Sequence, residues 1–95
     1  MEHEIRGVLP VVHTPFDQQE QIDWRAMKRQ VDWAFNAGCD GVCAAMVSEI
    51  LRLTDEERIA LTNQLTELVD NRGAVIISIG AESTRQAVNL GRVAE

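Results

Sequence analysis

The sequence predicts an α/β fold built from three consecutive strand–helix units. Three short apolar runs open in nearly the same way at residues 7–9, 41–43 and 74–76, so their starts are 34 and then 33 residues apart. Each run is almost continuously apolar, which is typical of parallel strands that are covered on both faces. An amphipathic segment follows each run, and no linker rich in Ser or Pro separates the units. The 95 residues therefore belong to one domain.

The expected strands cover residues 8–13, 42–46 and 75–79. Pro10 lies inside the first of them and has no N–H group, so it cannot donate a hydrogen bond to a neighbouring strand. We therefore expect a bulge or an unpaired donor position in the first strand.

The expected helices are marked by their ends. Asp23 is a good N-cap for the first helix, and Gly38 supplies its C-terminal stop. The second helix opens with a capping box in which Thr54 and Glu57 bond to each other's backbone. The third begins at Ser83 and has no stop signal before the end of the sequence. Three helices thus alternate with the three strands.

The composition argues against several classes of partner. Lys and Arg number 9 and Asp and Glu 15, a net charge of −6 that disfavours nucleic-acid binding. No apolar run approaches the ~20 residues of a membrane span, and the start lacks the basic segment of a signal peptide. Cys39 and Cys43 have no second pair and no nearby His, which indicates buried thiols instead of a metal site. We expect a cytoplasmic protein without metal, cofactor or membrane contact.

The length of the repeat narrows the architecture to two forms. A unit of about 33 residues fits an open doubly wound sheet or a closed eight-stranded barrel, and eight such units need about 265 residues. Three units alone would leave the edges of a parallel sheet open, which favours aggregation. We therefore expect the N-terminal third of a larger protein, with a self-contained three-layer domain as the alternative.

Six short motifs occur in order along almost the whole chain. They are GVLP (7–10), TPFD (14–17), ID (22–23), AGCDG (37–41), LTDEER (53–58) and GAESTR (80–85). Together they resemble the dihydrodipicolinate synthase / N-acetylneuraminate lyase family. The resemblance implies the first three β-α units of a (β/α)8 TIM barrel, with residues 1–95 as the N-terminal part of a single barrel domain whose remainder is absent from this chain. It also implies a class I aldolase, a lyase that forms a Schiff base with pyruvate or a related 2-oxo acid, in a homo-oligomer (dimer or tetramer) without a cofactor.

The loop after the second strand departs from the family pattern. Where the family typically has Gly-Thr-Thr-Gly-Glu, this sequence has Ala45-Met46-Val47-Ser48-Glu49. In the family the first threonine takes part in a proton relay and the second helps to bind the pyruvate carboxylate. The resemblance therefore makes Met46, Val47 and Ser48 the substrate-binding positions. Only Ser48 offers a side-chain hydroxyl there, and the backbone N–H groups of the loop can also hold a carboxylate.

No catalytic residue is assigned within these 95 residues. The resemblance places the Schiff-base lysine on the sixth strand and the catalytic tyrosine on the fifth, both beyond residue 95. The chain has no tyrosine, and its single lysine, Lys28, lies mid-helix at the edge of the apolar stripe. Because a Schiff-base lysine needs desolvation, Lys28 is not expected to react and the stretch alone is not expected to be active.

Four other side chains carry hypotheses. His13 ends the first strand and is either a general base, with an ordinary pKa of about 6.5, or a partly buried side chain bonded to backbone. Glu49 and Arg58 either form an ion pair that supports the loop after the second strand or remain solvated and unpaired. Trp33 lies opposite the apolar stripe of its helix and is either a subunit contact or a lone surface aromatic.

Two alternative functions remain beside the pyruvate-dependent lyase. One is a diverged barrel that acts on or binds another oxo acid. The other is an interaction module without chemistry.

Overall fold

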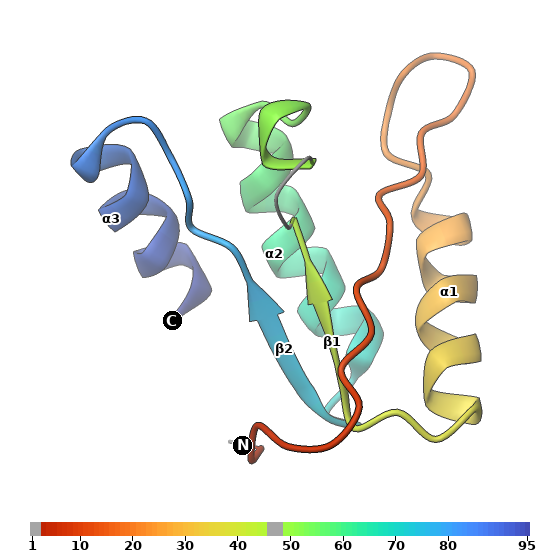
Figure 1. Ribbon diagram of the computed structural model, residues 1–95. Coiled ribbons are helices and arrows are strands. Elements are labelled where there is room, and N and C mark those ends of the chain that lie inside the picture. Colours follow the sequence, from red (N-terminus) through yellow and green to blue (C-terminus); the bar gives the residue numbers. More distant parts are fainter. Residues whose placement is uncertain (1–2, 46–48) are drawn as a thin grey trace.

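The computed structural model describes residues 3–45 and 49–95 and confirms alternating helices and parallel strands (Figure 1). The elements, in chain order, are α1 (Trp24–Asn36), β1 (Gly41–Ala44), the 3-10 turn η1 (Glu49–Leu51), α2 (Asp55–Val69), β2 (Ala74–Ile77) and α3 (Thr84–Ala94). None of the helices in the described ranges is long and apolar enough to cross a membrane.

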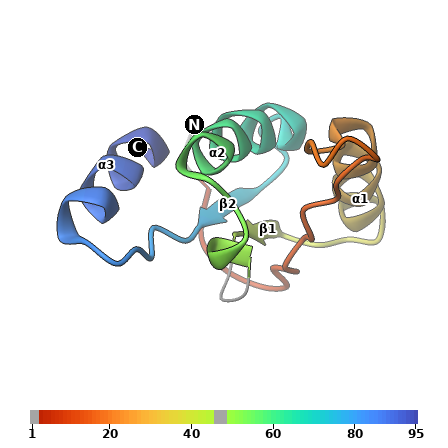
Figure 2. The same ribbon diagram turned by 90° about the horizontal axis from the view of Figure 1, so that it is seen from above.

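The two strands pair in parallel, and the helices gather on one side of them. Gly41 of β1 lies opposite Ala74 of β2, and Ala44 lies opposite Ile77. Viewed from above, α1, α2 and α3 form an arc over one face of this sheet (Figure 2). No α-helix from the described parts of the chain covers the opposite face.

The strand predicted over residues 8–13 forms only one bridge. Val11 pairs in parallel with Cys43, where the Val12 N–H donates to the Cys43 carbonyl (2.9 Å) and the Cys43 N–H donates to the Pro10 carbonyl (2.9 Å). In a parallel ladder every second residue donates to the same neighbour, so the donor before Val12 would be Pro10. Pro10 has no N–H group, and the ladder stops there. The segment therefore runs beside β1 as the prediction required, without becoming a regular strand.

The other two predicted strands are confirmed but begin one residue earlier and end two residues earlier. The end of β1 has a local cause, since Ala45 adopts a left-handed conformation with φ 56°. That conformation is unfavourable for a residue with a Cβ atom and breaks the extended geometry that a ladder needs. Past the end of β2, the Ser78 N–H still donates to the Ala44 carbonyl (3.4 Å).

The helix ends are those that the sequence predicts. The Asp23 side chain accepts from the backbone of α1, and Ser83 does the same for α3. Both bonds of the capping box are formed, because the Glu57 N–H donates to the Thr54 hydroxyl and the Thr54 N–H donates to the Glu57 carboxylate. Gly38 has φ 98°, a left-handed conformation that glycine adopts easily where α1 stops.

The core lies between the sheet and the helices. The largest fully buried side chains come from α1, β1 and α2, namely Met27, Val31, Val42, Leu61, Leu65 and Val69. Gly73, at the start of β2, is needed for close packing, because a Cβ atom there would lie 2.3 Å from the Asp40 carbonyl oxygen. Side chains from the helix layer and from the sheet thus pack directly against each other.

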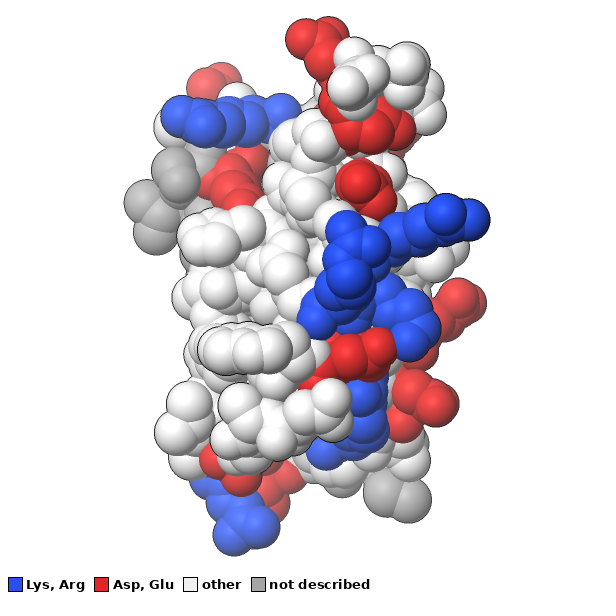
Figure 3. Space-filling model, turned by 90° about the vertical axis from the view of Figure 1, so that its right-hand side faces the viewer, with Lys and Arg blue, Asp and Glu red and all other residues white. Residues whose placement is uncertain are grey.

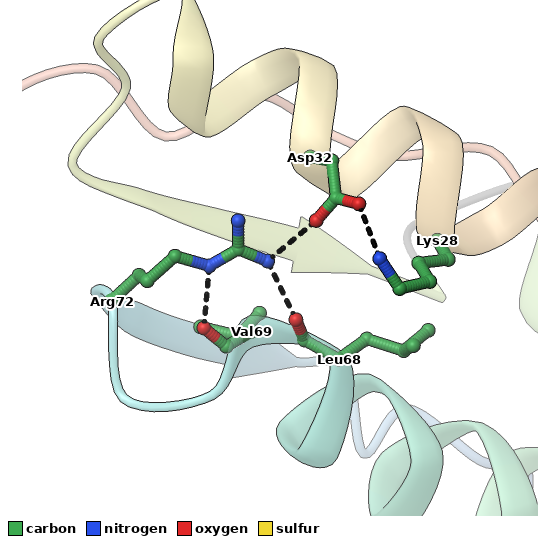
Figure 4. A network of polar contacts seen from close by, with 5 residues as sticks. All are labelled: Lys28, Asp32, Leu68, Val69 and Arg72. Atoms are coloured by element: carbon green, nitrogen blue, oxygen red, sulfur yellow. Dashed lines mark hydrogen bonds and ion pairs between the residues drawn. The ribbon is translucent and has the colours of Figure 1, made fainter.

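A polar network joins α1 to the end of α2 (Figure 4). Asp32 binds the Lys28 ammonium (2.6 Å) and the Arg72 guanidinium (2.9 Å), and Arg72 also donates to the carbonyls of Leu68 (2.7 Å) and Val69 (2.9 Å). Hydrogen bonds from Lys28 and then Arg72 lower the pKa of Asp32. The Lys28 ammonium is paired and its side chain is largely exposed, which agrees with a structural role.

Candidate functional site

The candidate site lies at the carboxyl ends of the strands. Because β1, β2 and the segment over residues 8–13 run in the same direction, the loops that follow them meet at one end of the molecule, the upper end in Figure 1. Proteins built from parallel strand–helix units place their ligands at this end.

Glu49 joins two of these loops. Its carboxylate accepts the backbone N–H of Thr14 at Oε1 (2.9 Å) and the Thr14 hydroxyl at Oε2 (2.7 Å). The Glu49 side chain is only 20% exposed. Hydrogen bonds to an ionised carboxylate are shorter and stronger than neutral ones. Glu49 therefore fixes the exit of the first apolar segment to the turn η1, although 35 residues separate the two partners.

The hypothesis of a Glu49–Arg58 ion pair is wrong. Arg58 is 4% exposed and donates from Nη2 to the Ser78 carbonyl (3.0 Å), just after β2. No ion pair joins Arg58 to Glu49 in the described parts of the chain, where the carboxylate is taken up by Thr14. Each charged side chain is instead hydrogen-bonded to a backbone group that follows a strand, and this bond compensates the cost of burying the charge.

Arg58 keeps one buried donor, Nε, for which residues 3–45 and 49–95 supply no hydrogen-bond partner. Its neighbour along α2, Thr62, donates its hydroxyl to the Arg58 carbonyl (2.9 Å). Arg58 therefore supports the exit of β2 from the helix side, as Glu49 supports the exit of the first segment.

His13 is fixed through its backbone and exposes its ring. Gln30 of α1 accepts from the His13 N–H (3.0 Å) and donates to the His13 carbonyl (2.7 Å). The imidazole is 87% exposed, with Nδ1 3.8 Å from Glu49 Oε1. The interpretation of His13 as a partly buried side chain is therefore wrong. Gln30 was missed at the sequence level, since a polar residue beside the apolar stripe of a helix gives no signal of its distant partner.

The predicted substrate-binding positions Met46, Val47 and Ser48 lie outside the described residues. Both neighbours are placed, because Ala45 is buried with φ 56° and Glu49 is held by Thr14. The assignment of the three residues remains a prediction.

Cys39 and Cys43 are both free thiols. Burial raises the pKa of Cys43, which keeps this thiol protonated and unreactive. Among the residues that are described, no three His, Cys, Asp or Glu side chains are grouped so that they could hold a metal ion.

Trp33 projects from α1, as predicted, and is 73% exposed. It lines a groove of about 550 Å³ between α1 and residues 10–13, whose walls also include Ala26 and Arg29. On this side of the molecule a band of uncharged residues runs beside a cluster of Lys and Arg (Figure 3). Most residues that line the groove are apolar, and such a surface is of the kind that packs against other protein.

Comparison with known proteins identifies relatives over almost the whole chain. L-2-keto-3-deoxyarabonate dehydratase from Azospirillum brasilense is 41% identical over 81 residues, which are 84% of this chain and 26% of that protein. 4-Hydroxy-tetrahydrodipicolinate synthase from Saccharophagus degradans is 32% identical over 92 residues, 96% of this chain and 32% of that protein. The chain thus spans about a third or less of the length of these relatives.

Solved structures show the same arrangement of helices and parallel strands. The 4-hydroxy-tetrahydrodipicolinate synthase of Methylacidiphilum fumariolicum SolV superposes with a TM-score of 0.88 at 28% identity, over 96% of this chain and 30% of that one. The chloride-inhibited dihydrodipicolinate synthase from Acinetobacter baumannii, complexed with pyruvate, gives a TM-score of 0.87 at 25% identity, over 96% and 32%. The fold is consistent with the N-terminal part of a barrel. Residues 4–95 also match the model of the dihydrodipicolinate synthetase family, and the chain belongs to that family.

Proposed function

We propose that the intact protein is a lyase of the class I aldolase type that forms a Schiff base with a 2-oxo acid. The match of residues 4–95 to the dihydrodipicolinate synthetase family carries this proposal. The reacting lysine and the catalytic tyrosine are expected beyond residue 95. The described residues would then supply one sector of the site, at the carboxyl ends of the first three strands.

In this proposal the loop over Met46, Val47 and Ser48 binds the carboxylate of the substrate. Support comes from the two ends of the loop, where Ala45 turns the chain away from β1 and Glu49 is anchored by Thr14. The Ser48 hydroxyl and backbone N–H groups are the donors we assign to the carboxylate, because Met46 and Val47 have no side-chain donor.

Two substrate classes are candidates. The Acinetobacter baumannii structure is complexed with pyruvate, which supports pyruvate itself. The Azospirillum brasilense relative is named for L-2-keto-3-deoxyarabonate, a longer 2-oxo acid that carries hydroxyl groups. The absence of both family threonines in residues 45–49 favours the longer acid, because the pocket has changed where pyruvate would be held.

We also propose a cytoplasmic homo-oligomer, a dimer or tetramer, as the family resemblance implies. Trp33 projects from α1 and is the exposed side chain that we assign to a subunit contact. A binding role without catalysis is the remaining alternative.

Borohydride reduction tests the Schiff base, because it converts an imine between a lysine and an oxo acid into a stable adduct that mass spectrometry detects. We expect weak or no trapping of pyruvate by the intact protein. The loss of a bond to a charged carboxylate costs about 1.5–3 kcal/mol, roughly 10- to 150-fold in affinity. Met46→Thr combined with Val47→Thr should strengthen the trapping of pyruvate. Efficient trapping of pyruvate by the unmodified protein would show that Ser48 or the backbone replaces the threonines.

The same assay tests the broader proposal. A protein that gives no adduct with pyruvate or with a 2-oxo-3-deoxypentonate would not be a Schiff-base lyase for this class, and the binding role would be favoured.

A further inference from the structure

His13 is an exposed polar side chain at the site, and the proposed mechanism gives it no role. It stands where the first apolar segment ends, beside the residue that closes the predicted substrate loop, with Nδ1 3.8 Å from Glu49 Oε1. Its imidazole is 87% exposed. In the described ranges the ring has no other hydrogen bond or ion pair, so Nε2 is available to a ligand.

The surroundings fix the backbone of His13 and the carboxylate beside its ring. Gln30 binds both backbone groups of His13, at 3.0 and 2.7 Å. Thr14 anchors Glu49 through two hydrogen bonds, so the carboxylate beside the imidazole is fixed as well. A fixed backbone and a fixed neighbouring carboxylate leave only the rotation of the side chain itself to be ordered on binding.

The alternation of side chains along the segment assigns the His13 ring to the face of the sheet that lies away from the helices. Val12 is buried in the core between the sheet and the helices. Side chains alternate between the two faces of an extended segment, so His13 belongs to the opposite face. That face carries no α-helix from the described residues (Figure 2), and in a closed barrel it becomes the interior.

We propose that His13 is a specificity-determining residue that hydrogen-bonds a hydroxyl group of a 2-oxo acid longer than pyruvate. This inference rests on the proposed function and names the substrate class for the same site. In this proposal the oxo group of pyruvate forms the imine and its carboxylate is bound by the loop. The remaining methyl group has no hydrogen-bond donor or acceptor for an imidazole. A hydroxyl on a longer chain can donate to or accept from Nε2. A site built to bond a hydroxyl discriminates strongly against the analogue that lacks it.

The test compares two substrates in the intact protein. Borohydride trapping is measured over a range of concentrations of pyruvate and of a 2-oxo-3-deoxypentonate. His13→Ala should raise the concentration of the pentonate that gives half-maximal trapping about tenfold. The corresponding concentration of pyruvate should change less than about twofold. His13→Gln should restore much of the pentonate affinity, because its amide can hydrogen-bond near the position of Nε2. His3→Ala is the matched control, since His3 binds Asn71 (2.9 Å) far from the site and should leave both substrates unchanged.

Each remaining outcome overturns the inference in a recognisable way. An equal loss of affinity for both acids would make His13 a structural residue. If His13→Ala loses affinity for neither acid, His13 does not bond a substrate hydroxyl. The same conclusion follows if the unmodified protein traps pyruvate but not the pentonate. If the unmodified protein traps neither acid, the proposed function itself fails, and this inference fails with it.

Discussion

Glu49→Ala is expected to loosen the exit of the first apolar segment without unfolding the core. The substitution removes the acceptor of the Thr14 N–H (2.9 Å) and of the Thr14 hydroxyl (2.7 Å). The core between α1, α2 and the sheet does not include Glu49, so the helices should keep their structure. The effect should therefore be local, and amide hydrogen exchange is the observable that resolves it.

The magnitude follows from the charge on the acceptor. A hydrogen bond to an ionised group contributes about 1.5–3 kcal/mol, which corresponds to roughly 10- to 150-fold in an opening equilibrium. The Thr14 amide should exchange faster by a factor in this range. The Val12 amide donates to the Cys43 carbonyl (2.9 Å) and should change much less. Glu49→Gln keeps a carbonyl acceptor without the charge, so its effect on Thr14 should be smaller.

Glu56→Ala is the matched control, because it removes an exposed carboxylate of α2 for which the described residues show no hydrogen bond or ion pair. It should leave the exchange of the Thr14 amide unchanged. If Glu49→Ala also leaves it unchanged, the carboxylate does not hold the loop. An equal acceleration in both variants would point to net charge as the cause.

Two further predictions concern α1. Because Lys28 and Arg72 lower the pKa of Asp32 in the folded protein, the ionised carboxylate stabilises the fold above its ordinary pKa of 3.8, and this contribution disappears as the pH falls through the lower folded value. Urea unfolding of the unmodified protein and of Asp32→Asn gives the difference between their free energies of unfolding. This difference should be constant near neutral pH and should shrink below about pH 4. A difference that does not depend on pH would contradict the prediction. Trp33→Asp should shift the intact protein to smaller species in size-exclusion chromatography, and an unchanged elution volume would argue against a subunit contact there.

The sequence by itself determined the order of the elements and the residues at which the helices begin. The caps at Asp23, Thr54 and Ser83 could be predicted because each bonds a backbone group only three residues away. The missing donor of Pro10 likewise predicted where the first ladder would break, since it depends only on the chemistry of one residue. The family resemblance was also present in the motifs, and residues 4–95 confirm it.

The contacts that build the site were decided by the tertiary structure. Because strand ends and helix starts share one rim of a barrel, an ion pair between Glu49 and Arg58 was one of two hypotheses, yet Glu49 binds Thr14 and Arg58 binds the carbonyl of Ser78. The interpretation of His13 as a partly buried side chain was also wrong. Gln30 of α1 hydrogen-bonds its backbone, and the ring remains exposed. A cap depends only on the spacing of neighbouring residues. Partners 17 to 35 residues apart come into contact only when the strands are paired in the right register and the helices are packed against them.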